Sequence, residues 1–165
     1  MIKKTLGVLF LVSLFLATPI FSKQADSKKE PIVTVEGLQL NTLNHGKLSL
    51  NDYKGKLIIL DFFATWCPPC VAEIPHFIAL QKKYGDKLVV IGLSVEDSSK
   101  PVLAFIKKRN IHYPVALATE KAYSYFPHFS SIPTTILLNK KREVVATVQG
   151  YESEEEWESR IKPLL

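Results

Sequence analysis

Residues 61–75, DFFATWCPPCVAEIP, decide the fold of this chain. Its 165 residues include only two cysteines, Cys67 and Cys70, and both lie in this stretch with Pro68 and Pro69 between them. The residues before Cys67 belong to a continuous apolar run of strand length, as expected of a central strand that is buried on both faces. The residues after Cys67 carry apolar side chains at mostly helical spacing, so we expect a strand that leads into a helix there.

Strands and helices alternate along the rest of the chain. Apolar runs bounded by turn residues predict strands at residues 56–64, 87–96, 113–117, 134–139 and 143–150. Apolar residues at helical spacing predict helices at residues 68–84, 102–108, 120–126 and 152–161. Ahead of these elements, residues 33–50 alternate loosely around an Asn-His-Gly break, which predicts a small β-hairpin. This order predicts a three-layer α/β sandwich with a mixed central sheet and helices on both faces.

The N-terminus predicts export. A short basic start, MIKK, is followed by residues 6–21, LGVLFLVSLFLATPIF, which are uncharged and almost wholly apolar. This pattern is typical of a secretory signal peptide, and cleavage would remove residues 1–22 with Ser22 as the last of them. A retained membrane anchor is the alternative, although the run is slightly short for a span of about 20 residues. Either way, we expect the rest of the chain outside the cytoplasm, in the periplasm or at the outer face of the inner membrane.

The remaining chain predicts one linker and one domain. Residues 23–31 are polar and charged without periodicity, which is typical of a linker, and residues 32–165 are long enough for one domain with a real core. The formal net charge of the chain is +5, and it falls to +3 without Lys3 and Lys4. The basic residues are scattered and form no stripe interleaved with aromatic residues, so we expect no nucleic-acid partner.

Two thiols at positions i and i+3 have several uses. A structural zinc site needs four ligands, and the sequence has no second cysteine pair and only dispersed histidines. Covalent haem attachment needs His directly after the second cysteine, where this chain has Val71. A structural disulfide across so short a loop stabilises little. Reversible redox chemistry is the use we favour, because the N–H groups at a helix start stabilise a thiolate on Cys67. An inert disulfide and a pair that holds Cu(I) remain as alternatives.

The segment DFFATWCPPC resembles the active site of the thioredoxin superfamily. Together with NDYKGK before it, CVAEIP after it and SIPTTILLN downstream, it is similar to the extracytoplasmic TlpA/ResA-like thiol-disulfide oxidoreductases. The similarity runs from about Leu40 to the C-terminus. It implies a thioredoxin-like fold with an extra N-terminal β-hairpin, and an enzyme that works without a cofactor or a metal.

The resemblance implies four catalytic residues. Cys67 matches the nucleophile that faces solvent, and Cys70 matches the buried cysteine that resolves the mixed disulfide. Asp61 matches the buried acid beneath the cysteines of thioredoxins, and its apolar neighbours favour a dry site in which the pKa of a carboxyl rises. Glu73 matches the acid that ResA-like proteins keep beside the site, and it shares a helix face with Cys70. An exposed strand-end acid and a solvated helix acid are the alternatives for Asp61 and Glu73.

The resemblance also implies five residues that contact substrate. Trp66 matches the residue that covers the site, and Pro68 and Pro69 lie between the two cysteines. Pro133 matches the cis-proline that faces the disulfide, and Ile132 precedes it. A cis bond between Ile132 and Pro133 would present a backbone edge that pairs with a substrate strand.

The chain departs from the family pattern in two places. Ser131 stands two residues before Pro133, where the family usually has Gly, and this change could alter how a substrate strand docks. Residues 139–142, NKKR, replace the usual Asp-Lys-x-Gly hairpin turn. Because a turn without Gly gives up the easiest residue for positive φ, we expect a longer or looser hairpin there.

The paired prolines indicate the direction of the reaction. Pro68 and Pro69 have no N–H groups, so the Cys67 thiolate loses nearby donors, and a poorly stabilised thiolate makes the pair a better reductant. We therefore expect a reductase of disulfides in exported proteins. The family resemblance implies apocytochrome c as a frequent client. The compartment outside the cytoplasm implies electrons from a membrane thiol carrier, and we expect a monomer. A dithiol oxidase and a Cu(I) metallochaperone are the alternative functions.

Overall fold

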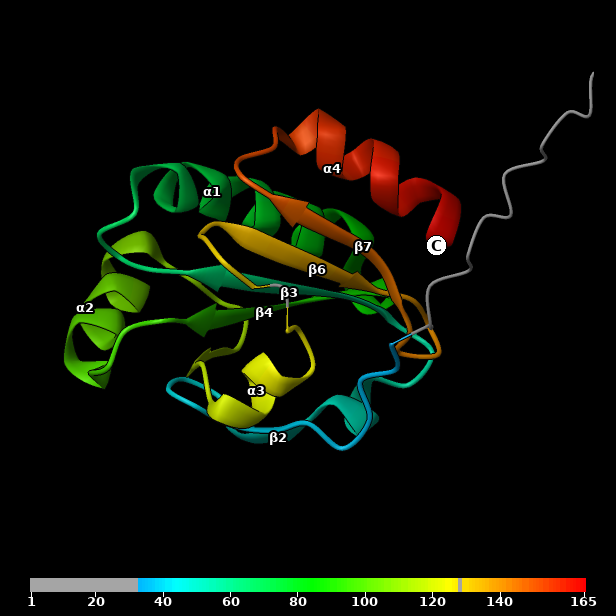
Figure 1. Ribbon diagram of the computed structural model, residues 1–165. Coiled ribbons are helices and arrows are strands. Elements are labelled where there is room, and N and C mark those ends of the chain that lie inside the picture. The colour runs from blue at the N-terminus through cyan, green and yellow to red at the C-terminus, as the bar shows by residue number, and fades with distance from the viewer. Residues whose placement is uncertain (1–32, 128) are drawn as a thin grey trace, which may run out of the picture. The chain divides into compact units, whose positions relative to one another are not determined.

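The computed structural model describes residues 33–127 and 129–165, in which a mixed sheet lies between two helical layers (Figure 1). The strands are β1 (Gln39–Thr42), β2 (Gly46–Ser49), β3 (Leu57–Phe63), β4 (Leu88–Ser94), β5 (Val115–Leu117), β6 (Thr134–Leu138) and β7 (Val144–Gln149). The α-helices are α1 (Pro68–Tyr84), α2 (Ser99–Arg109), α3 (Glu120–Ser124) and α4 (Glu154–Ile161), and 3₁₀ turns cover η1 (Leu50–Tyr53), η2 (Gly85–Lys87) and η3 (Lys162–Leu164). The predicted signal peptide or anchor and the linker lie outside the described residues.

The seven strands form one sheet in the order β2-β1-β5-β4-β3-β6-β7. Strand β3 is parallel to β4 and β4 to β5, whereas β6 runs antiparallel to β3 and β7 antiparallel to β6. The antiparallel hairpin β1–β2 joins the sheet through β1, which pairs with β5. The predicted mixed sheet and its extra N-terminal hairpin are therefore confirmed.

Strand β3 is buried along its whole length because both of its faces are covered. One face, which carries Leu57, Ile59 and Phe63, packs against apolar residues of α1, α2 and α4. The other face packs against α3 and the N-terminal hairpin region. Figure 1 shows α1 and α4 on one side of the sheet and α3 on the other. This arrangement is the predicted three-layer sandwich, and it explains why the run before Cys67 is apolar except for Asp61.

One helix start agrees with expectation and one differs. Residues 98–101, SSKP, predict a start with a serine cap and Pro101 in the first turn, and helix α2 begins at Ser99 with Ser98 as its N-cap. Helix α4 begins at Glu154, because Ser153 and Glu156 form a capping box at its N-terminus. Glu152, which we expected in this helix, lies before it in the loop after β7.

The β6–β7 turn is closed without glycine, and the strand pairing next to it is irregular, with a register shift between Leu137 and Leu138. Arg142 occupies the left-handed region with φ 66°. The Asn139 side chain holds the turn, because its Oδ1 accepts from the backbone N–H groups of Lys141 (2.9 Å) and Glu143 (3.1 Å). An Asn side chain that mimics a backbone turn thus compensates for the missing glycine.

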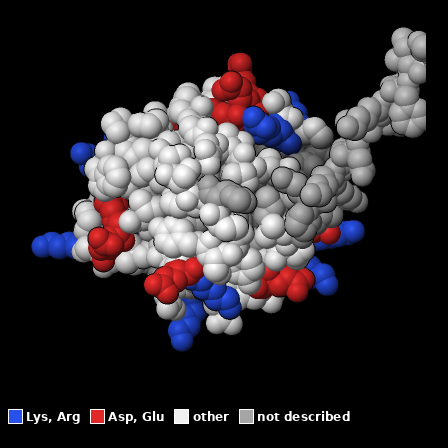
Figure 2. Space-filling view, viewed as in Figure 1, with Lys and Arg blue, Asp and Glu red and all other residues white. Residues whose placement is uncertain are grey.

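The described surface carries mixed charge. On the face seen in Figure 2, acidic and basic residues lie close to one another around a broad uncharged area. Within residues 33–127 and 129–165, no helix combines the length and the apolar character that a membrane span requires.

Candidate active site

The two cysteines lie where β3 passes into α1, and they form a disulfide. Cys67 is the N-cap of α1, with extended backbone angles, and Cys70 lies in the first turn of the helix. Cys67 is 4% exposed and Cys70 is fully buried. The first cysteine is thus the one nearer to solvent, in the order expected of a nucleophile and a resolving thiol.

One backbone donor reaches the Cys67 sulfur. The Cys70 N–H points at Cys67 Sγ with an N···S distance of 3.3 Å. Pro68 and Pro69 fill the first two helical positions, so neither has an N–H to contribute. The helix N-terminus therefore stabilises a thiolate here less than an ordinary first turn with three free N–H groups would.

Exposed side chains frame the sulfurs. Trp66 is 67% exposed, and Pro68 and Pro69 are exposed as well. Ile132 packs against the core cluster that contains both cysteines. The Ile132–Pro133 peptide bond is cis, as predicted, and Pro133 is buried directly before β6. Trp66, Pro68 and Pro69 are thus next to the cysteines along the chain, and Ile132 contacts the core cluster to which both cysteines belong. Contact of these residues and Pro133 with substrate stays a prediction.

Asp61 is a buried carboxyl without hydrogen-bond partners. It lies on β3 on the face toward α1, because it follows the alternation of Ile59 and Phe63, and it is 1% exposed. Neither of its oxygens has a partner among the described residues. Burial raises its pKa well above the usual value, the charge of Glu73 raises it further, and the nearby Thr135 hydroxyl lowers it somewhat without a hydrogen bond of ordinary geometry. The exposed-acid alternative is therefore wrong.

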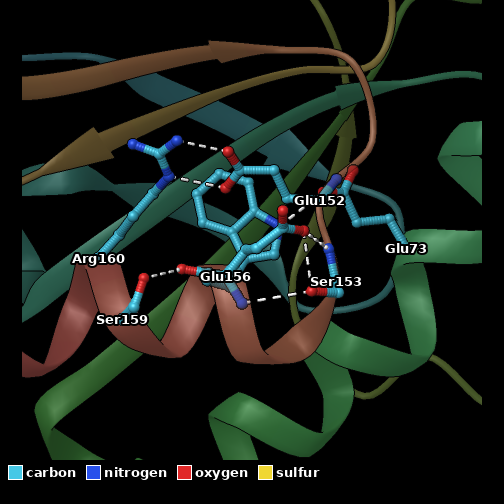
Figure 3. Close-up of polar contacts among 7 residues, drawn as sticks. Glu73, Glu152, Ser153, Glu156, Ser159 and Arg160 are labelled. Atoms are coloured by element: carbon cyan, nitrogen blue, oxygen red, sulfur yellow. Dashed lines mark hydrogen bonds and ion pairs between the residues drawn. The ribbon is translucent and has the colours of Figure 1, made fainter.

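Glu73 is the second buried carboxyl, and it points from α1 toward α4 (Figure 3). Its Oε1 accepts from Trp157 Nε1–H (2.5 Å) and from the backbone N–H of Glu152 (3.1 Å). Its Oε2 is buried and has no partner in the part of the chain that the structure describes. Burial raises the pKa of Glu73 to about 7, although these two hydrogen bonds oppose the shift. The solvated-acid alternative is therefore wrong, and this carboxyl can exchange a proton near neutral pH.

Contacts made by α4 hold the donors of Glu73 in place. Arg160 binds both carboxylate oxygens of Glu152, at 2.7 and 2.5 Å (Figure 3). Trp157 is buried against Phe77 of α1. Sequence reasoning missed these partners of Glu73. A single Trp in the acidic helix EEEWESR was the available signal, because a buried indole N–H needs an acceptor.

Glu96 is a further residue that sequence reasoning missed. It follows β4, and its carboxylate accepts from the Thr65 hydroxyl (2.6 Å) and the Ser94 hydroxyl (2.8 Å). Thr65 directly precedes Trp66, so Glu96 ties the segment that leads to Cys67 to the end of the neighbouring strand. This contact limits how far that segment can move when the disulfide opens.

Across the described ranges 33–127 and 129–165, no three His, Cys, Asp or Glu side chains gather as metal ligands. The chemistry that this arrangement can perform is two-electron exchange. The Cys67–Cys70 pair can exchange with another disulfide, and two buried carboxyls accompany it: Glu73 lies on α1 three residues after Cys70, and Asp61 lies on the sheet face toward α1.

The AhpC/TSA family model matches residues 33–147. Thioredoxin-like protein YneN of Bacillus subtilis is 37% identical over 169 residues, which cover 98% of this chain and 98% of that protein. Thiol-disulfide oxidoreductase ResA of Bacillus subtilis is 32% identical over 128 residues, which cover 75% of this chain and 72% of that protein.

Solved structures resemble the same region. A thioredoxin-family thiol:disulfide interchange protein from Chlorobium tepidum superposes with a TM-score of 0.75 at 27% identity, covering 81% of this chain and 97% of that one. StoA from Bacillus subtilis superposes with a TM-score of 0.65 at 28% identity, covering 78% of this chain and 98% of that one.

Proposed function

This chain belongs to the AhpC/TSA family and is a thiol-disulfide oxidoreductase of the ResA and StoA type, and on that premise we propose that it works as a reductase of disulfides in exported proteins. Cys67 is the nucleophile and Cys70 the resolving thiol. Asp61 and Glu73 take up the proton of Cys70.

One observation carries the reductive direction. The Cys67 sulfur receives a single backbone N–H, because prolines occupy the two positions between the cysteines. A dithiol is a strong oxidant when its thiolate is well stabilised, so a poorly stabilised thiolate favours the disulfide form and makes the pair a reductant.

The reaction proceeds in two exchanges. The Cys67 thiolate attacks one sulfur of the client disulfide, forms a mixed disulfide, and releases the other client sulfur as a thiolate that takes a proton from water. Cys70 then gives its proton to a carboxylate of the Asp61–Glu73 pair and attacks the Cys67 sulfur. The mixed disulfide breaks, the second client thiolate leaves, and two electrons have passed from the cysteine pair to the client.

The N-terminal sequence supports the proposed compartment. Residues 1–22 act as a signal peptide or anchor, residues 23–31 as a linker, and residues 32–165 as the redox domain outside the cytoplasm. In that compartment the oxidised pair must be reduced again by a thiol carrier in the membrane. An apocytochrome c with its Cys-x-x-Cys-His segment is the client class that we propose.

The reduced full chain is expected to convert an oxidised Cys-x-x-Cys-His peptide to its dithiol, with one equivalent of chain oxidised for each peptide. Free thiols on the peptide, counted by mass after alkylation, give the measurement. The yield should be the same with a Cu(I) chelator present. If the chain binds Cu(I) tightly but does not reduce the peptide, the result supports the metallochaperone. If the chain neither reduces the peptide nor binds Cu(I), the result supports an inert disulfide.

A further inference from the structure

A glycine on β4 makes room for an aromatic ring beside the buried acids. Gly92 pairs with Asp61 in the parallel register of β3 and β4. A Cβ atom at Gly92 would lie 3.4 Å from Cε2 of Tyr113 and 3.1 Å from Cε1 of Phe63. Because Gly92 has no side chain, the ring of Tyr113 lies over it, next to the strand position of Asp61.

The Tyr113 hydroxyl is buried without a hydrogen-bond partner. Tyr113 is 2% exposed and belongs to the same core cluster as Cys67 and Cys70. Its hydroxyl has no partner among the described residues, and the same holds for both oxygens of Asp61 and for Oε2 of Glu73. Buried polar atoms are rarely left unpaired, so such a cluster calls for an explanation.

The Tyr113 hydroxyl also lies within electrostatic reach of both acids. Burial raises the pKa of Tyr113 well above its ordinary value, and the charges of Asp61 and then Glu73 raise it further. A phenol with a raised pKa is protonated at neutral pH, so Tyr113 can act as a hydrogen-bond donor there. The carboxyls around it can accept such a bond, directly or through a buried water.

We propose that Tyr113 is a positioning residue for resolution, whose hydroxyl donates a hydrogen bond to whichever carboxylate of the Asp61–Glu73 pair takes the proton of Cys70. This inference rests on the proposed proton transfer by these two acids. A donor to the carboxylate form stabilises that form in a dry site, and so keeps a base available near neutral pH.

The other donors that face the two acids leave a place for Tyr113. The buried Thr135 hydroxyl lies opposite Asp61 on β6 and lowers the pKa of that carboxyl. The donors of Glu73, Trp157 and the Glu152 amide, both bind Oε1 and leave Oε2 free. Glu152 itself adds a negative charge, and Arg160, which offsets that charge, is held by both oxygens of Glu152 and therefore is not a donor to Glu73.

The test is a single-turnover reaction of the reduced full chain with an aromatic disulfide whose released thiolate is coloured. The first equivalent of colour reports the attack by Cys67, and the second reports the resolution by Cys70. In Tyr113→Phe, we expect an unchanged first phase. We expect the low-pH limb of the second phase to shift upward by about 0.5 to 1 pH unit, which is about three- to tenfold in rate below the midpoint.

Tyr84→Phe is the matched control. Tyr84 packs against the same core cluster, but its hydroxyl donates to Glu158, so its loss should leave both phases unchanged. A second phase in Tyr113→Phe that superimposes on the wild-type pH profile would overturn the inference. An equal shift in Tyr84→Phe would overturn it too, because the effect would then be one of general packing.

The chain with both Asp61→Asn and Glu73→Gln separates this inference from the proposed function. In that background, Tyr113→Phe should change the second phase no further, and an additional shift would contradict the proposal. A wild-type second phase in the double variant would mean that the acids themselves have no role in resolution.

Discussion

Cys70→Ser is expected to accumulate mixed disulfides with its clients, whereas Cys67→Ser forms none and reduces nothing. Cys67 is the partly accessible sulfur and caps the helix, while Cys70 is fully buried behind it. The attack by Cys70 is intramolecular, with an effective concentration far above that of any free thiol. Its loss should slow release of the client by more than about 1,000-fold at millimolar external thiol.

The trapped complexes are measured as bands on non-reducing gels after the full-length variants are incubated with oxidised client. The chain with both cysteines replaced by serine is the control for non-covalent binding. Trapping by Cys67→Ser in place of Cys70→Ser would reverse the assigned roles.

Replacing both buried acids is expected to slow resolution by about 100-fold, and either single variant, Asp61→Asn or Glu73→Gln, by about 10-fold. In the proposed function each carboxyl assists removal of the Cys70 proton, so the effects of the two single variants should multiply in the double variant. The attack by Cys67 should be little affected. The second phase of coloured thiolate release gives the measurement.

Asp97→Asn is the matched control for lost charge, because Asp97 is an exposed acid in the loop after β4, at the same end of the sheet. It should leave both phases unchanged. Resolution at the wild-type rate in both single variants and in the double variant would rule out the proton-transfer role.

Stability provides a check that these variants stay folded. The pKa of Glu73 rises from 4.5 to about 7 on folding, so the folded chain binds this proton more tightly than the unfolded chain. Its contribution to the free energy of unfolding is full below pH 4.5 and is lost as the pH rises through about 7. The neutral side chain of Glu73→Gln does not become charged, so the free energy of unfolding of this variant should exceed that of wild type above about pH 7. A buried acid that lowers stability at neutral pH is consistent with a functional role for that acid.

The fold was predictable from the sequence because its central elements have unambiguous local patterns. An unbroken apolar run can only be a strand covered on both faces or part of a buried helix, and the cysteine-proline segment after residues 56–64 settles where the helix begins. Turn and cap details were less predictable. Asn139 replaces a turn glycine through its side chain, and the capping box of Ser153 and Glu156 places Glu152 outside its helix.

The partners of the site were less predictable than its cysteines. Trp157 and the Glu152 amide reach Glu73 across sequence separations of 84 and 79 residues. Periodicity tells which face of a helix is apolar, but it does not tell which residues of another helix meet that face. Likewise, the sequence alone does not link Gly92 with Tyr113. The register of β3 and β4 places Gly92 beside Asp61, and the lack of a side chain at Gly92 leaves room for the Tyr113 ring.

The reduction potential of the Cys67–Cys70 pair, measured by glutathione redox titration of the full chain, tests the reductive function most directly. A single backbone donor to the Cys67 sulfur predicts a potential near thioredoxin's, roughly −270 mV, well below the roughly −120 mV of a strong oxidant. A potential above about −180 mV would contradict the reductase and support a dithiol oxidase.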